Sequence, residues 1–113
     1  MRRRAPDLDL TFRALAAPAR RAVVARLSAG PASVSELAAP FDMALPSFMQ
    51  HLDVLEKGGL VRSHKAGRVR TYELVRPQLA RATHWLDAQR ARWECRFDQL
   101  DALVTSPNRQ ERH

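Results

Sequence analysis

The sequence predicts a mainly α-helical chain with one small β-hairpin and a long C-terminal helix. Three observations lead to this fold class. Apolar residues recur at helical spacing up to residue 57, β-prone residues fill two short runs between 60 and 74, and large apolar residues then repeat every seven positions. The 113 residues are enough for one domain with a modest core.

The first two helices are marked by their apolar spacing and their boundaries. Leu8 and Phe12 lie on one helical face, and Asp7 can cap the first helix. Pro18 suits the first turn of a second helix, where its missing N–H costs nothing. Gly30 and the proline after it end that helix.

A helix–turn–helix pair should follow. Ser33 and Glu36 have the spacing of a capping box, so a short third helix begins at Ser33 and ends near Pro40. Pro46 suits the first turn of a fourth helix, which runs to Lys57. Its inner face should consist of Phe48, Leu52 and Leu55.

Residues 60–65 and 68–74 are expected to form the two strands of a hairpin, with Ala66 and Gly67 as its turn. Tyr72 and Leu74 should point inward, which places Arg70 near the tip. Residues 31–33 can add a short edge strand.

The last element is a helix over about 77–104, roughly 40 Å long at 1.5 Å per residue. Its apolar repeat predicts pairing with a second copy of the chain, helped by the first helix, whereas packing across its own domain is the alternative. Residues 1–7 are expected to be a flexible basic start and 106–113 a frayed tail. The predicted dimer interface consists of Leu8, Phe12, Leu79, Leu86, Trp93, Phe97 and Leu100.

Charge is unevenly distributed along the chain, whose net formal charge is +7. Residues 1–28 carry net +5 and residues 60–76 net +4, while the segment between them carries net −3. Two basic segments in a compact domain indicate contact with a polyanion such as nucleic acid. General solubility is the alternative explanation.

The order of helices, helix–turn–helix, basic hairpin and long helix is that of a winged helix–turn–helix. Four segments resemble ArsR-type (ArsR/SmtB-like) bacterial transcriptional regulators in order and spacing, and the likeness extends from about residue 8 to 104. They are LAAPARRAVVARL at 15–27, VSELA at 34–38, QHLDVLEKGGLV at 50–61 and GRVRTY at 67–72. The resemblance implies a homodimeric repressor that binds double-stranded DNA.

In this family the fourth helix, here 45–57, enters the major groove, where each base pair shows a distinct pattern. The polar candidates for base readout are Ser47, Gln50 and His51. Gln50 can pair bidentately with an adenine edge. Ser47 as a local helix cap and His51 as a packed histidine are the alternatives.

The sequence departs from the family where Met49 and Gln50 replace a frequent Ser and Lys. The fourth helix has no basic residue between Leu45 and Glu56, so phosphate contacts must come from elsewhere. We expect these phosphate contacts from the second helix and from the wing at 62–70. For any single arginine, a solvated surface charge is the alternative. The candidates are Arg20, Arg21, Arg62, His64, Lys65, Arg68 and Arg70, with Arg2, Arg3 and Arg4 as a possible arm.

We expect neither a metal nor a cofactor. Some family members bind metal through a Cys-x-Cys pair in the third helix, and the segment 36–40 has no cysteine. His84, Asp87 and Glu94 do not make a four-coordinate site. Cys95 is a lone thiol, either incidental or redox-sensing.

No enzyme motif appears: the chain lacks a Gly-rich phosphate loop, GxSxG and HExxH. It also lacks an apolar run near the ~20 residues that span a bilayer. We therefore expect a cytoplasmic homodimeric repressor that binds a pseudo-palindromic operator. The sequence does not identify its effector. A protein-interaction module and a thiol- or small-molecule-responsive regulator are the alternatives.

Overall fold

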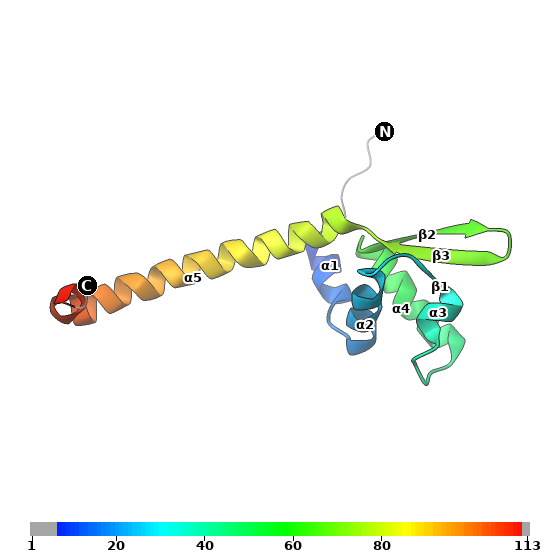
Figure 1. Cartoon of the computed structure of the whole chain (residues 1–113), viewed down its shortest axis with the longest axis horizontal. Coiled ribbons are helices and arrows are strands. Elements are labelled where there is room, and N and C mark those ends of the chain that lie inside the picture. Colours follow the sequence, from blue (N-terminus) through cyan, green and yellow to red (C-terminus); the bar gives the residue numbers. More distant parts are fainter. Residues whose placement is uncertain (1–6, 112–113) are drawn as a thin grey trace. The chain divides into compact units, whose positions relative to one another are not determined.

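A computed structural model describes residues 7–111 (Figure 1). The proposed arm at Arg2 to Arg4 and most of the predicted flexible start lie outside the described residues. Within the described range the chain forms α1 (Leu8–Ala14), α2 (Pro18–Leu27), β1 (Ala32–Ser33), α3 (Val34–Ala38), α4 (Leu45–Lys57), β2 (Val61–Ala66), β3 (Val69–Leu74) and α5 (Arg76–Glu111). The predicted winged helix–turn–helix is confirmed.

The described chain divides into two compact units, one up to Ala82 and one from Thr83 onward. The first unit contains a single apolar core, built around the inner face of α4. Phe48, Leu52 and Leu55 of that face are at most 1% exposed, as their spacing predicts. The core is completed by Ala14, Val23, Val24, Leu27, Ala32, Leu37, Leu60, Val61, Tyr72 and Leu74.

Local signals set the helix starts. Asp7 accepts a hydrogen bond from the backbone N–H of Asp9 at 3.0 Å, so it caps α1. Ser33 and Glu36 form the predicted capping box, in which each side chain accepts from the other residue's backbone N–H at 3.2 and 2.8 Å. These hydrogen bonds satisfy N–H groups that a helix start leaves without partners.

The three strands form an antiparallel sheet in the order β1-β3-β2. The edge strand expected near 31–33 is present as β1. The hairpin turn is corrected by one residue: Ala66 pairs with Val69, so the turn consists of Gly67 and Arg68 rather than Ala66 and Gly67. Gly67, the first residue of the turn, has a φ of +64°. Two-residue turns with positive φ at this position favour glycine.

A buried polar contact joins α1, the end of α4 and the start of α5. The Thr11 hydroxyl donates to the Gly58 carbonyl at 2.7 Å and accepts from the Gln78 amide at 2.8 Å. Gly58 must approach α1 closely, because a Cβ there would lie 2.9 Å from the Leu10 carbonyl oxygen. The end of α4 is therefore fixed against α1.

The second unit is the continuation of α5, and its large apolar side chains are exposed within the single chain. Leu86, Trp93 and Phe97 are 52%, 56% and 60% exposed. The helix ends at Glu111 rather than near Val104, so the predicted frayed tail is helical over its described part. Pro107 lies inside this stretch and cannot donate a backbone hydrogen bond, whereas residues 109–111 have high helix propensity.

Candidate nucleic-acid interface

The outward face of α4 is polar and short of charge. At about 100° per residue, Ser47, Gln50 and His51 fall within an arc of about 100°, away from the core-facing Phe48 and Leu52. Ser47 and Gln50 are exposed, and neither side chain has a partner among the described residues. Both polar groups are therefore available to a ligand.

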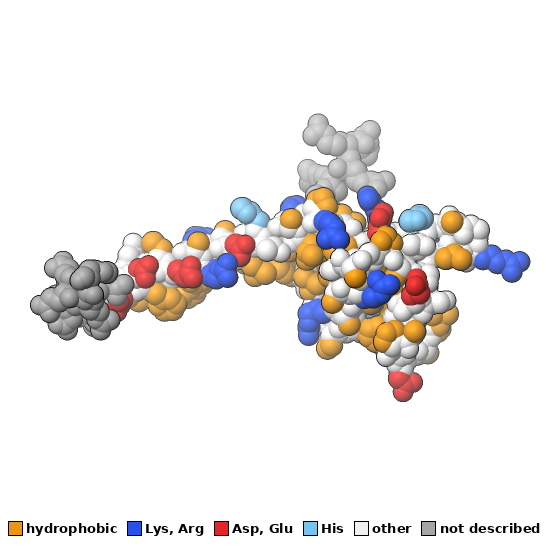
Figure 2. Space-filling view, in the orientation of Figure 1, with side chains coloured by type: hydrophobic (Ala, Val, Ile, Leu, Met, Phe, Trp, Pro, Cys, Tyr) orange, Lys and Arg blue, Asp and Glu red, His pale blue; other side chains and the backbone are white. Residues whose placement is uncertain are grey.

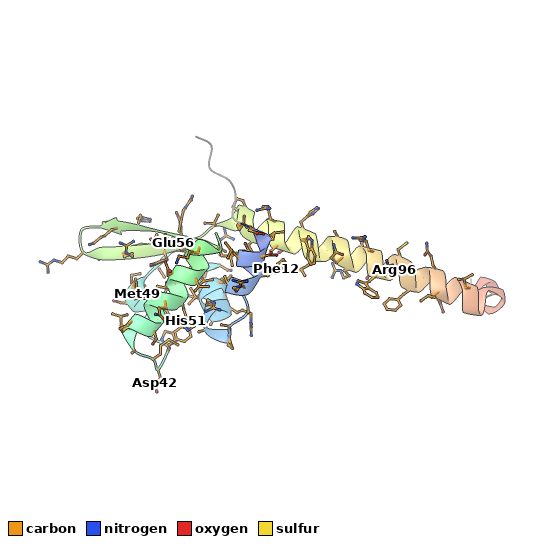
Figure 3. All side chains as sticks on the ribbon, turned by 180° about the vertical axis from the view of Figure 1, so that it is seen from behind. Phe12, Asp42, Met49, His51, Glu56 and Arg96 are labelled. Atoms are coloured by element: carbon orange, nitrogen blue, oxygen red, sulfur yellow. The ribbon has the colours of Figure 1, made fainter. Side chains whose placement is uncertain are left out.

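His51 is half-buried and its ring contacts an arginine side chain. Its Nδ1 lies 2.9 Å from Nη1 of Arg20 on α2. Arg20 in turn donates through Nε to the Ala14 carbonyl at 2.8 Å and through Nη2 to the Arg13 carbonyl at 3.4 Å. Figure 3 shows His51 on α4, labelled together with Met49 and Glu56. The structure thus links α1, α2 and α4 through one guanidinium group.

Arg21 has a similar role beside it. Its Nη1 donates to the Leu15 carbonyl at 2.8 Å, while the side chain remains exposed. The two arginines that the sequence assigned to phosphate binding both hold carbonyls at the end of α1. Arg21 keeps exposed donors for a further contact, whereas Arg20 is largely committed inside the protein.

The wing presents cations at its tip. Lys65 and Arg68 are exposed and have no side-chain partner among the described residues, and His64 is also exposed. Figure 2 shows Lys or Arg side chains at this end of the β2–β3 hairpin. The corrected turn explains this position, because Arg68 is a turn residue and not part of a strand.

The other two wing arginines make intramolecular contacts. Arg62 forms an ion pair with Glu73 across the strands at 2.7 Å. Arg70 donates to the Ser63 hydroxyl at 3.0 Å, and that hydroxyl lies 3.5 Å from a Glu56 carboxylate oxygen. Arg70 therefore helps to fasten the wing to the end of α4.

A shallow depression of about 380 Å³ lies between the start of α3, α4 and the wing. Hydroxyl groups of Ser33 and Ser35 line one side, and the wing side carries Lys65, Arg68 and Arg70. Burial of Tyr72 on β3, together with the Glu56 carboxylate, raises the pKa of that phenol. A hydroxyl-lined depression with a cationic rim suits the phosphate backbone of a nucleic acid.

The outward face carries one further exposed residue that the sequence analysis did not include among the candidate base contacts. Asp53 lies one turn after Gln50 and forms an ion pair with Lys57 at 3.0 Å. A carboxylate in the major groove accepts from the N4 amino group of cytosine. The three-residue spacing from Gln50 was the signal available in the sequence.

A helix–turn–helix domain model matches residues 15–64. The crystal structure of an ArsR family transcriptional regulator is similar to this chain with 55% identity and a TM-score of 0.72, covering 77% of this chain and 90% of that one. The biofilm growth-associated repressor of Agrobacterium fabrum is 33% identical over 81 residues, which are 72% of this chain and 69% of that protein.

The chain belongs to the ArsR family of transcriptional regulators. A further relative, the HTH-type transcriptional regulator Rv2034 of Mycobacterium tuberculosis, is 44% identical over 66 residues. That match covers 58% of this chain and 62% of the relative, so the chain spans under two thirds of this relative's length.

Within residues 7–111 of this ArsR-family chain, no group of three or more His, Cys, Asp or Glu side chains is placed to hold a metal ion. Cys95 is an exposed free thiol. No helix in the part of the chain that the structure describes has the length and apolarity needed to cross a membrane.

The predicted dimer residues divide between the two units. Leu8, Phe12 and Leu79 are half-buried in the first. In the second, the rings of Trp93 and Phe97 lie 5.8 Å apart, one helical turn from each other, and Arg96 lies over the Trp93 ring at 5.9 Å. The remaining members, Leu86 and Leu100, are more than half exposed.

Proposed function

We propose that this ArsR-family chain is a sequence-specific regulator of double-stranded DNA that acts in the cytoplasm as a homodimeric repressor. The observation that carries the proposal is the pairing of two adjacent surfaces. The recognition helix exposes Ser47 and Gln50 without partners, and the wing exposes Lys65 and Arg68 without partners. Base edges and phosphates are the ligands that such surfaces bind.

The recognition helix supplies the base contacts. The major groove of B-DNA admits an α-helix, and its base edges show a distinct donor and acceptor pattern for each pair. Gln50 pairs bidentately with the N6 and N7 atoms of adenine, which is worth ~1–3 kcal/mol of discrimination. Ser47 and His51 contact the neighbouring positions.

The wing supplies most of the phosphate contacts. Lys65 and Arg68 bind the backbone directly, and Arg62, Arg70 and Arg21 add exposed donors around them. Each neutralised phosphate releases counterions, so log affinity falls with log salt concentration by about 0.9 per contact. These contacts set the register of the protein without reading sequence.

The second unit supplies the dimer. Leu86, Trp93, Phe97 and Leu100 form an exposed apolar seam on one face of α5, and a second copy can cover it. Two recognition helices related by a twofold axis require a pseudo-palindromic operator with half-sites about one helical turn apart. Repression then follows from occlusion of the promoter, in keeping with the likeness to the Agrobacterium repressor.

The test selects duplexes from a random library with the full chain and measures binding across a salt series. Gln50→Ala should weaken the selected duplex about 5- to 150-fold for each half-site and relax preference at one position in each. Arg68→Ala should weaken all sequences alike and reduce the salt slope by about 1 per half-site.

Arg92→Ala is the matched control for Arg68→Ala, because Arg92 is an exposed arginine off the apolar seam that donates to Gln89 on its own helix. It should leave both the affinity and the salt slope unchanged. Salt-insensitive retention of a protein partner, with no enrichment of any duplex, would instead support a protein-interaction module.

A further inference from the structure

We propose that Arg20 is a positioning residue that holds His51 in the tautomer with its proton on Nε2, so that the recognition helix presents a hydrogen-bond donor to guanine. The inference rests on the proposed function, since it concerns how one side chain of α4 recognises DNA. It also reassigns Arg20, which the sequence analysis expected to bind phosphate.

The tautomer follows from the chemistry of the contact. Arg20 Nη1 lies 2.9 Å from His51 Nδ1. A guanidinium has five N–H donors, no acceptor and stays protonated in proteins, so Nδ1 must be the acceptor. A neutral imidazole that accepts at Nδ1 carries its hydrogen on Nε2.

The guanidinium is held independently of the histidine. Arg20 is half-buried and donates to two carbonyls at the end of α1, those of Ala14 at 2.8 Å and Arg13 at 3.4 Å. Carbonyls in the last turn of a helix lack intrahelical partners, so they accept hydrogen bonds from cationic side chains such as arginine. Arg20 therefore imposes its orientation on the ring, because α1 fixes the guanidinium in place.

The opposite nitrogen of the ring is open to a ligand. Nε2 of His51 has no hydrogen-bond partner among the described residues. No partly or fully buried residue in that same part of the chain has a side-chain nitrogen or oxygen that is both buried and without a partner. Nε2 must therefore contact solvent, on the flank of α4 that also carries Ser47 one turn earlier.

A lone N–H donor selects among acceptors on DNA. The major-groove edge of guanine carries two acceptors, N7 and O6, and no donor. Adenine offers one acceptor, N7, beside an amino donor, thymine offers the single acceptor O4, and cytosine offers only an amino donor, so guanine is the best match for a lone N–H donor. A phosphate oxygen is the other acceptor within the same chemistry, and it would make the contact independent of sequence.

The first experiment measures the tautomer in the free protein by ¹⁵N–¹H NMR of the histidine side chains at about pH 8, where an ordinary histidine is neutral. In the wild type we expect an unprotonated Nδ1 and a protonated Nε2 for His51. Arg20→Met should bring the two ¹⁵N shifts closer together, because the ring then exchanges between tautomers. Arg26→Met, on the same helix and bonded only to Gly30, should leave the shifts unchanged.

The second experiment is a double-mutant cycle on the selected duplex. His51→Ala should weaken binding about five- to tenfold and remove a guanine preference at one position per half-site. Arg20→Met should remove the same preference, and it should cause no further loss of that preference when His51 is already Ala. Thermal unfolding of each variant separates this effect from a loss of folded protein.

Two results overturn the proposal: an Nδ1–H tautomer in the wild type, or an Arg20→Met effect on base preference that persists in the His51→Ala background. A uniform loss across all sequences on His51→Ala overturns the guanine contact and assigns Nε2 to a phosphate. Failure of the wild type to bind any duplex would refute the proposed function alone, since the NMR measurement needs no DNA.

Discussion

The two units of the chain treat apolar side chains in opposite ways. Up to Ala82, the core-facing Phe48, Leu52 and Leu55 of α4 are at most 1% exposed, whereas Trp93 and Leu100 of the second unit are 56% and 57% exposed. A surface exposed to this degree over successive turns marks an interaction site rather than chance. The first unit completes its own core, and in the second the proposed dimer would cover the exposed side chains.

The largest effect is expected from a charge placed in the apolar seam of α5, because it should weaken the dimer. Trp93→Glu, present twice in a dimer, should weaken dimerisation by about 4 kcal/mol, or roughly 1000-fold. The buried tryptophan contact is lost and a carboxylate must be desolvated. Sedimentation equilibrium measures the dissociation constant.

Ala91→Glu is the control, because Ala91 is exposed and lies on the face of α5 opposite the seam. The same charge there should leave the dimer intact. Equal dissociation in both variants, or none in Trp93→Glu, would refute the assignment of the seam.

The second largest effect concerns the first unit. Leu52→Ala should lower the free energy of unfolding by about 2–5 kcal/mol, because it removes a fully buried side chain and leaves a cavity. Leu45→Ala on the same helix, where the leucine is 56% exposed, should change it by less than about 0.5 kcal/mol. Urea unfolding of both variants measures the difference, and comparable losses would contradict the buried role of Leu52.

A smaller effect is expected at Gly58, where α1 and the end of α4 meet. Gly58→Ala places a Cβ 2.9 Å from the Leu10 carbonyl oxygen and 3.0 Å from the Ala14 Cβ. Separating the two helices should cost about 1–3 kcal/mol of unfolding free energy. Gly58 has a negative φ, so backbone strain does not contribute. A melting temperature of Gly58→Ala equal to or above that of the wild type would contradict a close contact between Gly58 and α1.

The smallest effect belongs to the capping box of α3. Hydrogen bonds from the backbone and side chain of Ser33 lower the pKa of Glu36 below its usual value. Because the folded state favours the carboxylate, its stabilisation is present above the unfolded pKa and is lost as pH falls through the lowered one. Glu36→Gln should remove that part of the pH dependence between about pH 5 and pH 3, as followed by circular dichroism. An unchanged pH profile would contradict the cap.

Most of the fold could be predicted because its signals are local. The capping box at Ser33 and the prolines at the starts of α2 and α4 each depend on a few adjacent residues. The hairpin turn was misplaced by one residue because its register is set by pairing along both strands, as between Ser63 and Tyr72, and not by the turn alone.

The candidate site could be predicted in outline but not in its contacts. Ser47 and Gln50 follow from helical spacing, and the structure exposes both. The Arg20–His51 contact joins residues 31 positions apart and depends on how α2 packs on α4. The attachment of Arg70 to Ser63 likewise depends on the strand register, and no sequence pattern distinguishes it from Arg68 at the turn.

The central claim is that a paired recognition helix and wing read a twofold-related DNA sequence. Genome-wide mapping of DNA bound by the full chain, in the cell that encodes it, tests this claim most directly. We predict a recurring inverted repeat near promoters, with half-sites about one helical turn apart, that disappears for the combined Gln50→Ala and Arg68→Ala variant. Dispersed occupancy with no shared sequence, from a folded and dimeric protein, would contradict it.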